Sequence, residues 1–298
     1  MEEKRDVIII GSGMAGMTAA IYLKRGGLNP LVIEEGTPGG QLNKINQIEN
    51  YPGFVHTDGP TLGAEVFGQV QNLDIDYLYD KVIKVNLKTK TKKVITSKKT
   101  LTCDYLVIAT GRLSKKLFGD DEKYAGKGIS YCALCDGNLY KGKDVAVAGG
   151  GSSALEEALY LADICKSVTI IHHSEAFRAD AALIEQVNNK KNIKCVYNVD
   201  ITEYNIENGK LTSITLDNGD KVDVSGLFIS IGSVPSAEIF DVNKQKGFII
   251  VNKECMTNVE NVYACGDVIK KAVYQLTTAA GEATTVAYSI IKKEKAKK

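Results

Sequence analysis

Two stretches of the chain show the same succession of apolar and polar positions. Each opens with a short apolar run, VIII at residues 7–10 and VAVA at residues 145–148, which is typical of a strand buried in a parallel sheet. In both, a glycine-rich turn, a helical stretch and a second apolar run follow. The second apolar runs are residues 31–33 and 168–171. The sequence therefore predicts two βαβ units and an α/β fold.

Other apolar runs extend the two predicted sheets. Residues 106–111 (LVIATG) and 227–232 (LFISIG) are predicted to be buried strands that end at glycine, one for each half of the chain. Between residues 81 and 101, lysines and threonines alternate with apolar residues, which indicates a β-meander. We expect the lysine-rich end, residues 292–298, to be a solvated tail.

The first glycine-rich turn carries the spacing of a dinucleotide-binding site. Gly11 permits a tight turn, Gly13 lets the backbone approach a pyrophosphate, and Gly16 lets the following helix pack closely on the strand. The N-terminus of that helix faces the phosphates. An acid at the end of the second strand binds the ribose hydroxyls, and Glu34 is preferred to Glu35 because it directly follows the apolar run. A glycine turn without a ligand is the alternative, which the complete strand, helix and acid oppose.

The second turn, GGGSSA at residues 149–154, repeats this spacing. Gly149 and Gly151 supply the turn and the close approach, and Ala154 takes the place of the third small residue. One chain therefore carries two predicted dinucleotide sites. Two bound dinucleotides suggest electron transfer between them.

Cys132 and Cys135 are the only two of the seven cysteines that lie close in sequence. A zinc site needs two further ligands, whereas the other cysteines are scattered and His172 and His173 end a predicted nucleotide-domain strand. A permanent disulfide across so short a loop adds little stability, and two inert buried thiols are a third alternative. We favour a redox-active pair, because a thiolate that attacks a disulfide needs a second thiol close enough to displace the mixed disulfide.

The composition is that of a folded protein without a marked electrostatic bias. Of the 298 residues 44% are apolar and 24% are charged, and 37 Lys and Arg balance 36 Asp and Glu. The net charge therefore favours neither a nucleic acid nor an anionic membrane as partner, and the length fits two domains. No apolar run approaches the roughly 18 residues that span a bilayer, and the start, MEEKRD, is unlike a signal peptide. We therefore expect a cytoplasmic protein.

The order of the motifs along the chain resembles that of the low-molecular-weight thioredoxin reductases, which are FAD- and nicotinamide-dependent pyridine nucleotide-disulfide oxidoreductases. The resemblance covers nearly the whole chain, and the agreement of so many ordered motifs is far more specific than any one of them. The motifs are, in order, GSGMAG, GGQL, ENYPG, ATG, CALCDG, GGGSSALEEA, IGSVP, CGDV and TTAAGEA.

This resemblance implies an α/β fold with two Rossmann-like, three-layer dinucleotide-binding domains, the second inserted into the first. The FAD domain would comprise residues 1–113 and 244–298, and the nicotinamide domain, which carries the cysteine pair, residues 114–243. Electrons would pass from a nicotinamide dinucleotide to FAD, then to the cysteine pair, and finally to thioredoxin or a thioredoxin-like protein. The resemblance also implies a homodimer.

Single residues receive roles from the same resemblance. Cys132 would attack the oxidised partner, Cys135 would lie next to the flavin, and Asp136 would manage the thiol protons. The residues expected to contact FAD are Gly11, Ser12, Gly13, Ala15, Gly16, Glu34, Glu35, Gly40, Gln41, Asn50, Val82, Thr110, Gly111, Gly266, Asp267 and Gln275. Those expected to contact the nicotinamide dinucleotide are Gly149, Gly151, Ser152, Ser153, Ala154, His173, Arg178 and Gly232.

The chain departs from the family pattern where the electron donor binds. NADPH-using members carry HRRxxxR after the second fingerprint, and these arginines hold the 2′-phosphate. Here residues 172–178 read HHSEAFR, so that only Arg178 remains, and Tyr274 replaces the arginine of the usual RQ pair. NADPH and NADH both stay open as donors, with reduced ferredoxin or a second flavin as an alternative that the intact GGGSSA turn opposes.

Two other functions remain as alternatives. One is the reduction of a peroxidase system by the same chemistry, although such reductases often carry an additional N-terminal thioredoxin-like module. The other is a nucleotide-sensing protein without turnover, which has no need of Cys132 and Cys135. The retained cysteine pair therefore favours an enzyme.

Overall fold

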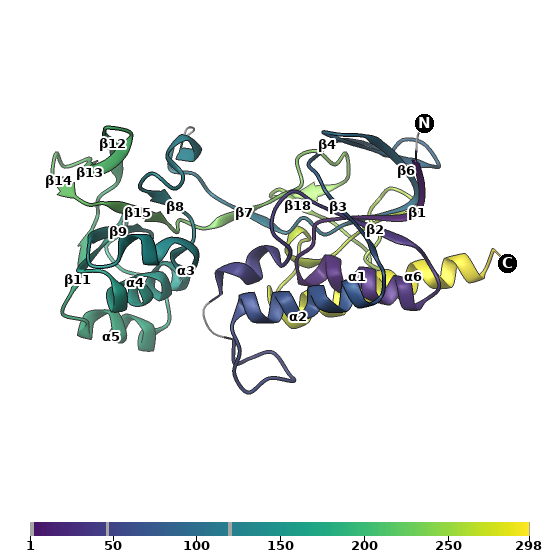
Figure 1. Ribbon diagram of the computed structural model, residues 1–298, viewed down its shortest axis with the longest axis horizontal. Helices are drawn as coiled ribbons and strands as arrows, with labels where there is room; N and C mark the ends of the chain where they lie inside the picture. Colours follow the sequence, from purple (N-terminus) through teal and green to yellow (C-terminus); the bar gives the residue numbers. More distant parts are fainter. Residues whose placement is uncertain (1–2, 46–47, 119–120, 298) are drawn as a thin grey trace. The chain divides into compact units, whose positions relative to one another are not determined.

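The computed structural model describes residues 3–45, 48–118 and 121–297, and the chain folds into two compact units. The first unit comprises Met1–Leu113 and Pro235–Lys298, and the second, Ser114–Val234, is inserted between these two segments (Figure 1). The chain leaves the first unit along β7 (Arg112–Ser114) and returns along β16 (Ser233–Pro235), and these two strands pair with each other in a two-stranded sheet.

The return to the first unit falls earlier than the sequence predicted, after Val234 rather than at residue 244. Residues 235–243 belong to the first unit because Ala237 and Phe240 are buried in its core. The polar stretch DVNKQKG, residues 241–247, is therefore a surface segment of the first unit and does not mark its boundary.

A seven-stranded sheet forms the centre of the first unit, in the order β3-β2-β1-β6-β5-β4 with β19 beside β6. The parallel strands are β1 (Glu3–Ile10), β2 (Pro30–Glu34), β3 (Asp76–Tyr79), β6 (Thr100–Ile108) and β19 (Val262–Ala264). Strands β4 (Val82–Asn86) and β5 (Lys92–Thr96) continue antiparallel from the first half of β6, which confirms the predicted β-meander.

Three helices cover one face of this sheet. They are α1 (Met14–Arg25), α2 (Gly59–Asn72) and α6 (Leu276–Lys295), and α1 packs against both of the others (Figure 1). Because side chains of a strand alternate between its faces, Val7 and Ile9 of β1 are buried with the helices, and Ile8 and Ile10 are buried on the opposite face. Short elements complete the unit: η1 (Gly40–Lys44), β17 (Lys244–Gln245), β18 (Phe248–Ile249) and η4 (Gly266–Val268).

The second unit has three layers around a parallel sheet in the order β11-β10-β9-β15-β8. These strands are β8 (Ile129–Ser130), β9 (Asp144–Ala148), β10 (Ser167–His172), β11 (Ile193–Tyr197) and β15 (Gly226–Ile229). One face packs on η2 (Asp121–Tyr124) and an antiparallel sheet of β12 (Ile201–Glu207), β13 (Lys210–Leu216) and β14 (Lys221–Asp223). The other packs on α3 (Ala133–Asp136), η3 (Gly137–Tyr140), α4 (Ser152–Ile164) and α5 (Ala181–Asn189).

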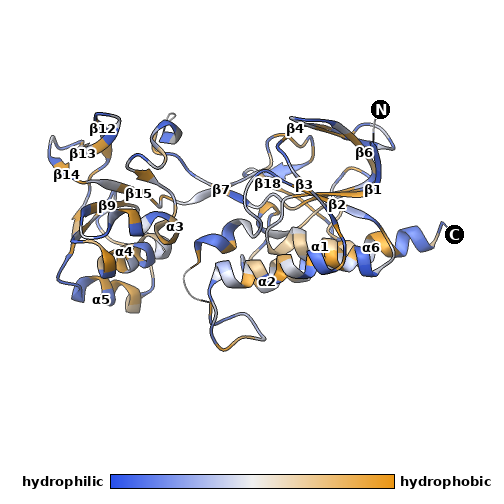
Figure 2. Ribbon diagram, in the orientation of Figure 1, coloured by the Kyte–Doolittle hydropathy of each residue, from blue (hydrophilic) through white to orange (hydrophobic). Residues whose placement is uncertain are grey.

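Burial in the second unit follows the same alternation along its central strand. Val145 and Val147 of β9 pack toward α4, whereas Ala146 and Ala148 pack toward the antiparallel sheet. Apolar residues accordingly concentrate on the central strands and on the inner sides of the helices (Figure 2). The predicted fold class, α/β with two Rossmann-like dinucleotide-binding folds, is confirmed.

Most of the lysine-rich end is exposed, as expected of a solvated tail, but it is helical as far as Lys295. Helix α6 continues to Lys295, and the ammonium group of Lys293 donates hydrogen bonds to Glu260 Oε1 (3.0 Å) and Asn261 Oδ1 (2.6 Å). The lysines therefore form the last turn of a helix, where positive charge interacts favourably with the helix dipole. Within residues 3–45, 48–118 and 121–297, no helix is both long and apolar enough to cross a membrane.

Candidate active site

The first glycine-rich turn is closely packed between β1 and α1. Gly11 adopts φ +100°, and a Cβ atom there would lie 2.4 Å from the carbonyl oxygen of Ala109. A Cβ atom on Gly16 would lie 1.9 Å from the carbonyl oxygen of Gly11. Gly13 precedes α1, and no side chain among the described residues caps this helix. The first N–H groups of α1 therefore remain available to an anionic ligand.

Glu34, at the end of β2, closes this turn. Its Oε2 accepts hydrogen bonds from the Ser12 N–H (2.8 Å) and hydroxyl (3.1 Å). The Tyr77 hydroxyl donates in turn to Ser12 Oγ (2.9 Å), a contact that no local pattern predicts, and burial raises the pKa of Tyr77. Glu35 is instead exposed and pairs with Lys81 at 2.8 Å. Of the two predicted acids, only Glu34 lies at the glycine turn.

Several other predicted FAD residues lie beside the turn or contact one another. The Gly39 N–H donates to the Ser12 carbonyl (2.9 Å), which brings the segment containing Gly40 and Gln41 beside the fingerprint. Asn50 Nδ2 donates to Gln275 Oε1 (3.2 Å), so two predicted residues 225 positions apart are in contact. Thr110 and Gly111 follow β6, the neighbour of β1, and Val82 begins β4 shortly after Asp80, whose N–H donates to the Glu34 carbonyl.

The pair Gly266–Asp267 lies against the start of α1, since a Cβ atom on Gly266 would be 2.8 Å from the Cβ of Ala15. Asp267 Oδ1 is 3.3 Å from the ammonium nitrogen of Lys271. This ammonium is also 3.0 Å from Glu282 Oε2, which accepts the Gly266 N–H at 2.9 Å. Burial raises the pKa of Glu282. Lys271 and Glu282 were missed, although Glu282 lies within the TTAAGEA motif.

The second glycine-rich turn joins β9 to α4 in the second unit. Gly149 adopts φ +144°, and a Cβ atom there would lie 2.2 Å from the carbonyl oxygen of Ser230. Gly151 precedes α4, whose first three residues are Ser152, Ser153 and Ala154. The Arg178 N–H donates to the Gly150 carbonyl (2.7 Å), so the segment after β10 lies beside the turn. Gly232 follows β15 with φ +95°.

A histidine stands where the first unit has its acid. His172 ends β10 and is 3% exposed, and its ring lies 2.4 Å from where a Cβ of Gly150 would be. Its Nε2 is 3.0 Å from the Ala176 carbonyl oxygen, whereas its Nδ1 has no hydrogen-bond partner within the described part of the chain. Burial lowers the pKa of His172. His173 and Arg178 are exposed beyond it.

Cys132 and Cys135 form a disulfide bond, with their Cα atoms 5.4 Å apart. Cys132 precedes α3 and is 6% exposed, whereas Cys135 is exposed. The remaining five cysteines are free thiols, and burial raises the pKa of Cys103, for example, to about 12, which suppresses its thiolate. Across the described ranges, no group of three or more His, Cys, Asp or Glu side chains is arranged to hold a metal ion.

Asp136, the predicted acid, lies one residue beyond the disulfide at the end of α3. Its Oδ2 is 2.7 Å from the hydroxyl of Ser130, a buried residue that sequence reasoning missed. Burial raises the pKa of the neighbouring Tyr140 hydroxyl, and the charge of Asp136 adds to the increase.

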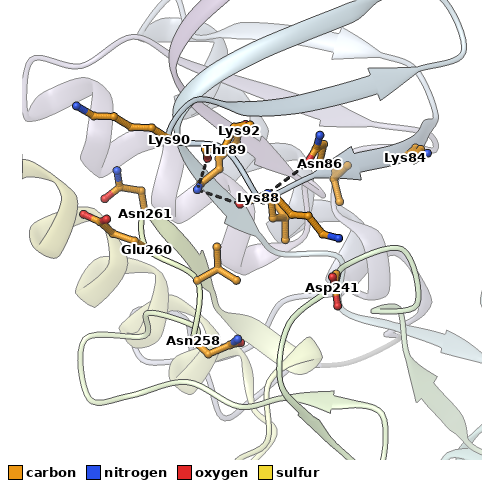
Figure 3. Close-up of a pocket in the computed structure, with 13 residues that line it drawn as sticks. Lys84, Asn86, Lys88, Thr89, Lys90, Lys92, Asp241, Asn258, Glu260 and Asn261 are labelled. Carbon is orange, nitrogen blue, oxygen red and sulfur yellow. Dashed lines mark hydrogen bonds between the residues drawn. The ribbon is translucent and has the colours of Figure 1, made fainter.

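A large cavity in the first unit belongs to none of the predicted sites. It encloses about 910 Å³ between the loop that joins β4 to β5 and the segment before β19, and several lysines line it (Figure 3). The buried ammonium of Lys92 donates to the carbonyl oxygens of Leu87 (3.2 Å) and Thr89 (2.8 Å), and so holds the loop. Volume alone does not identify the site of chemistry in this protein.

Two dinucleotide turns and a redox-capable cysteine pair in one chain define a class of protein, the oxidoreductases that act between pyridine nucleotides and disulfides. The profile of the family described as pyridine nucleotide-disulphide oxidoreductase matches residues 5–283, and the chain belongs to this family.

Thioredoxin reductases are among its similar relatives. The chain is 37% identical over 296 residues to the thioredoxin reductase of Ureaplasma parvum serovar 3, with 96% of each chain covered. The crystal structure of Lactococcus lactis thioredoxin reductase matches with a TM-score of 0.87 and 34% identity, covering 97% of this chain and 99% of that chain. A ferredoxin-flavin thioredoxin reductase from Clostridium acetobutylicum matches with a TM-score of 0.57 and 27% identity, covering 99% and 100%. The chain is therefore an enzyme, a flavoprotein disulfide reductase, and the predicted resemblance is confirmed.

Proposed function

We propose that this enzyme reduces the disulfide of thioredoxin, or of a thioredoxin-like protein, at the expense of a nicotinamide dinucleotide. The observation that carries the proposal is the Cys132–Cys135 disulfide in a unit that also holds a dinucleotide turn. FAD, when bound, supplies a two-electron carrier between the nicotinamide and the cysteine pair. The free state of the other five cysteines supports a reducing compartment, the cytoplasm, as the place of reaction.

The first unit fits FAD as its ligand. Space remains open beside Gly13, where a Cβ atom would have a nearest neighbour at 3.9 Å, and the uncapped start of α1 offers N–H groups to a pyrophosphate. We assign the ribose to Glu34, which lies at the turn. The other residues assigned to FAD are Gly11, Ser12, Ala15, Gly16, Gly40, Gln41, Asn50, Val82, Thr110, Gly111, Gly266, Asp267 and Gln275.

The cysteine pair performs the exchange with the protein substrate. In the reduced enzyme the Cys132 thiolate attacks one sulfur of the partner's disulfide, which forms a mixed disulfide and releases one partner thiolate. The Cys135 thiolate then attacks Cys132 Sγ, which re-forms the Cys132–Cys135 bond and releases the second partner thiolate. The two thiol protons pass to the partner's sulfurs, with Asp136 as the group that holds and returns them. Because Cys132 is buried in the oxidised pair, its segment has to open during the exchange.

The nicotinamide dinucleotide is assigned to the second glycine turn and the segment after β10. We assign its phosphates and ribose to Gly149, Gly151, Ser152, Ser153, Ala154, His173, Arg178 and Gly232. Arg178 is the only Lys or Arg between residues 172 and 178, so one permanent cation is left to recognise a 2′-phosphate. We therefore propose that discrimination between NADPH and NADH is weak.

Anaerobic stopped-flow spectroscopy tests the donor. The purified yellow protein is mixed separately with NADPH, NADH and reduced ferredoxin, and the bleaching of the flavin band is followed. We expect both dinucleotides to bleach it, with rate constants within about tenfold of each other. Bleaching by reduced ferredoxin alone would overturn the nicotinamide assignment and would make ferredoxin the electron donor, as the name of the Clostridium acetobutylicum ferredoxin-flavin thioredoxin reductase indicates for that protein.

Substitution of the cysteines tests the disulfide relay. The Cys135→Ser variant is expected to keep donor-dependent flavin bleaching and to lose thioredoxin reduction, because the mixed disulfide has no second thiol to resolve it. Cys195→Ser, at a partly exposed free cysteine of the same unit, is the matched control and is expected to retain both activities. Thioredoxin reduction by Cys135→Ser would remove the pair from the pathway.

We further propose a homodimer, for which light scattering should give twice the chain mass of 32.3 kDa.

A further inference from the structure

Ser130 joins the cysteine pair to Asp136 through three contacts of one hydroxyl group. Its Oγ is 2.7 Å from Asp136 Oδ2, 3.1 Å from the Cys132 nitrogen and 3.2 Å from the Cys132 carbonyl oxygen. The residue is 3% exposed, so water does not compete for these contacts. It ends β8, where it pairs with Phe228 of the central sheet. Ser130 therefore belongs to the edge strand of the central sheet, whereas the disulfide and Asp136 lie at the short helix that follows it.

The three contacts give the Ser130 hydroxyl hydrogen-bond partners in both protonation states of Asp136. A hydroxyl donates one hydrogen bond and accepts two. When Asp136 is ionised, Ser130 donates to its carboxylate and accepts the Cys132 N–H. When Asp136 is protonated, the Asp136 O–H donates to Ser130, and the Ser130 proton turns to the Cys132 carbonyl. In either state the Ser130 proton has an acceptor and the Cys132 N–H has a partner, which avoids the penalty for an unsatisfied buried donor.

We infer that Ser130 is a positioning residue that keeps Asp136 in place while the carboxyl group takes up and returns the thiol protons. The inference rests on the proposed function, because it concerns the proton steps of disulfide exchange. The proton is conserved throughout: the one that leaves a cysteine thiol resides on Asp136 until a partner sulfur receives it. Ser130 turns its own O–H bond without breaking it. The carboxyl group therefore changes its protonation state without leaving its position beside the cysteine pair.

The test separates the two half-reactions in the full-length, FAD-loaded enzyme. The first is donor-dependent flavin bleaching, and the second is reoxidation of the pre-reduced enzyme by oxidised thioredoxin. For Ser130→Ala we expect the maximal rate of reoxidation to fall about tenfold, with the thioredoxin concentration at half-maximal rate unchanged. Flavin bleaching should stay within about twofold of the wild type, since the donor half-reaction does not use the Ser130 hydroxyl. Ser130→Thr, which keeps the hydroxyl, should restore reoxidation.

Two controls distinguish positioning from a general effect on the fold. Ser213 is a second buried serine of the same unit, and its hydroxyl has no hydrogen-bond partner in the described part of the chain. Ser213→Ala should leave both half-reactions unchanged. In the Asp136→Asn background, Ser130→Ala should produce no further loss, because residues that act through one another are not additive.

Each outcome decides between the alternatives. Reoxidation of Ser130→Ala within about twofold of the wild type would overturn the inference, as would equal losses in both half-reactions or full additivity with Asp136→Asn. A wild-type enzyme that fails to reduce thioredoxin at all would overturn the proposed function instead. The failure of the inference is therefore seen in the Ser130→Ala variant, and the failure of the proposed function in the wild-type enzyme.

Discussion

The two glycine-rich turns have the same spacing but differ in how tightly they are built. In the first, the third residue of α1 is Gly16, and any Cβ atom would lie 1.9 Å from the carbonyl oxygen of Gly11. In the second, the third residue of α4 is Ala154, whose methyl group the turn accommodates. The same motif therefore leaves no room for a side chain in the first unit and room for one methyl group in the second.

The strands that follow the two turns end differently as well. Strand β2 ends in Glu34, which is hydrogen-bonded to Ser12 within the turn. Strand β10 ends in His172, which packs against Gly150 and leaves its Nδ1 without a hydrogen-bond partner among the described residues. Under the proposed assignment, the acid that binds the ribose is therefore part of the turn in the first unit, whereas in the second unit ribose binding depends on the exposed residues that follow the strand.

The largest difference is expected from exchanging the third residues of the two turns. Gly16→Ala should lower the free energy of unfolding by about 3 kcal/mol or more, because backbone atoms have to move to admit the methyl group. Ala154→Gly should lower it by only about 1 kcal/mol, the usual effect of glycine in a helix. Urea denaturation of both variants measures the difference, and equal losses would mean that the two turns are equally tight.

Removing the charge of Glu34 tests whether the acid belongs to the FAD site. A charge-assisted hydrogen bond to a ribose hydroxyl contributes about 1.5–3 kcal/mol, so Glu34→Gln should weaken FAD binding about 10- to 100-fold. Glu35→Gln is the matched control, because Glu35 is exposed and pairs with Lys81, and its effect should stay below about twofold. Fluorescence titration of the flavin-free protein gives both constants. A larger effect of Glu35→Gln would reverse the assignment.

Arginines placed after β10 should add the NADPH selectivity that we propose the second unit lacks. The double variant His173→Arg/Ser174→Arg is expected to raise the ratio of kcat/KM for NADPH to that for NADH about tenfold or more, because guanidinium groups pair with the 2′-phosphate. Steady-state kinetics with both donors measures this ratio. Glu175→Gln, which removes a charge from the same segment, should change it less than threefold. An unchanged ratio in the double variant would place the 2′-phosphate elsewhere.

The smallest effect concerns pH. Burial lowers the pKa of His172 from its ordinary value of about 6.5. Just below pH 6.5, His172 is therefore protonated in the unfolded chain but still neutral in the folded chain. The contribution of neutral His172 to the free energy of unfolding is therefore complete above about pH 6.5 and declines as the pH falls below it. His172→Gln should flatten this part of the stability profile between pH 7 and pH 5, as thermal unfolding would record. An unchanged profile would mean that other groups determine it.

Sequence reasoning succeeded where the signal was local. The strand, turn and helix around Gly11 and Gly149, and the meander of residues 81–101, depend on neighbouring residues, and all of them formed as predicted. The Cys132–Cys135 disulfide was also anticipated from spacing and context.

What escaped prediction depends on contacts between residues that are distant in sequence or unremarkable in type. Tyr77 meets Ser12 across 65 positions, and nothing in its local pattern distinguishes it from other tyrosines. Ser130 is one serine among many until the fold places its hydroxyl beside Asp136. The return to the first unit was predicted at residue 244 but falls after Val234, because Ala237 and Phe240 pack into the core of the first unit through contacts with residues distant in sequence.

The insertion of the second unit has a consequence for biosynthesis. Strand β19, which pairs with β6, and helix α6, which packs on α1, both follow the inserted unit in the chain. On the ribosome, residues 114–234 therefore emerge complete while the first sheet still lacks a strand and a covering helix. Domains generally fold as units during synthesis, so the second unit can mature first. During that interval one edge of β6 has no partner strand and the side of α1 that packs on α6 stays uncovered.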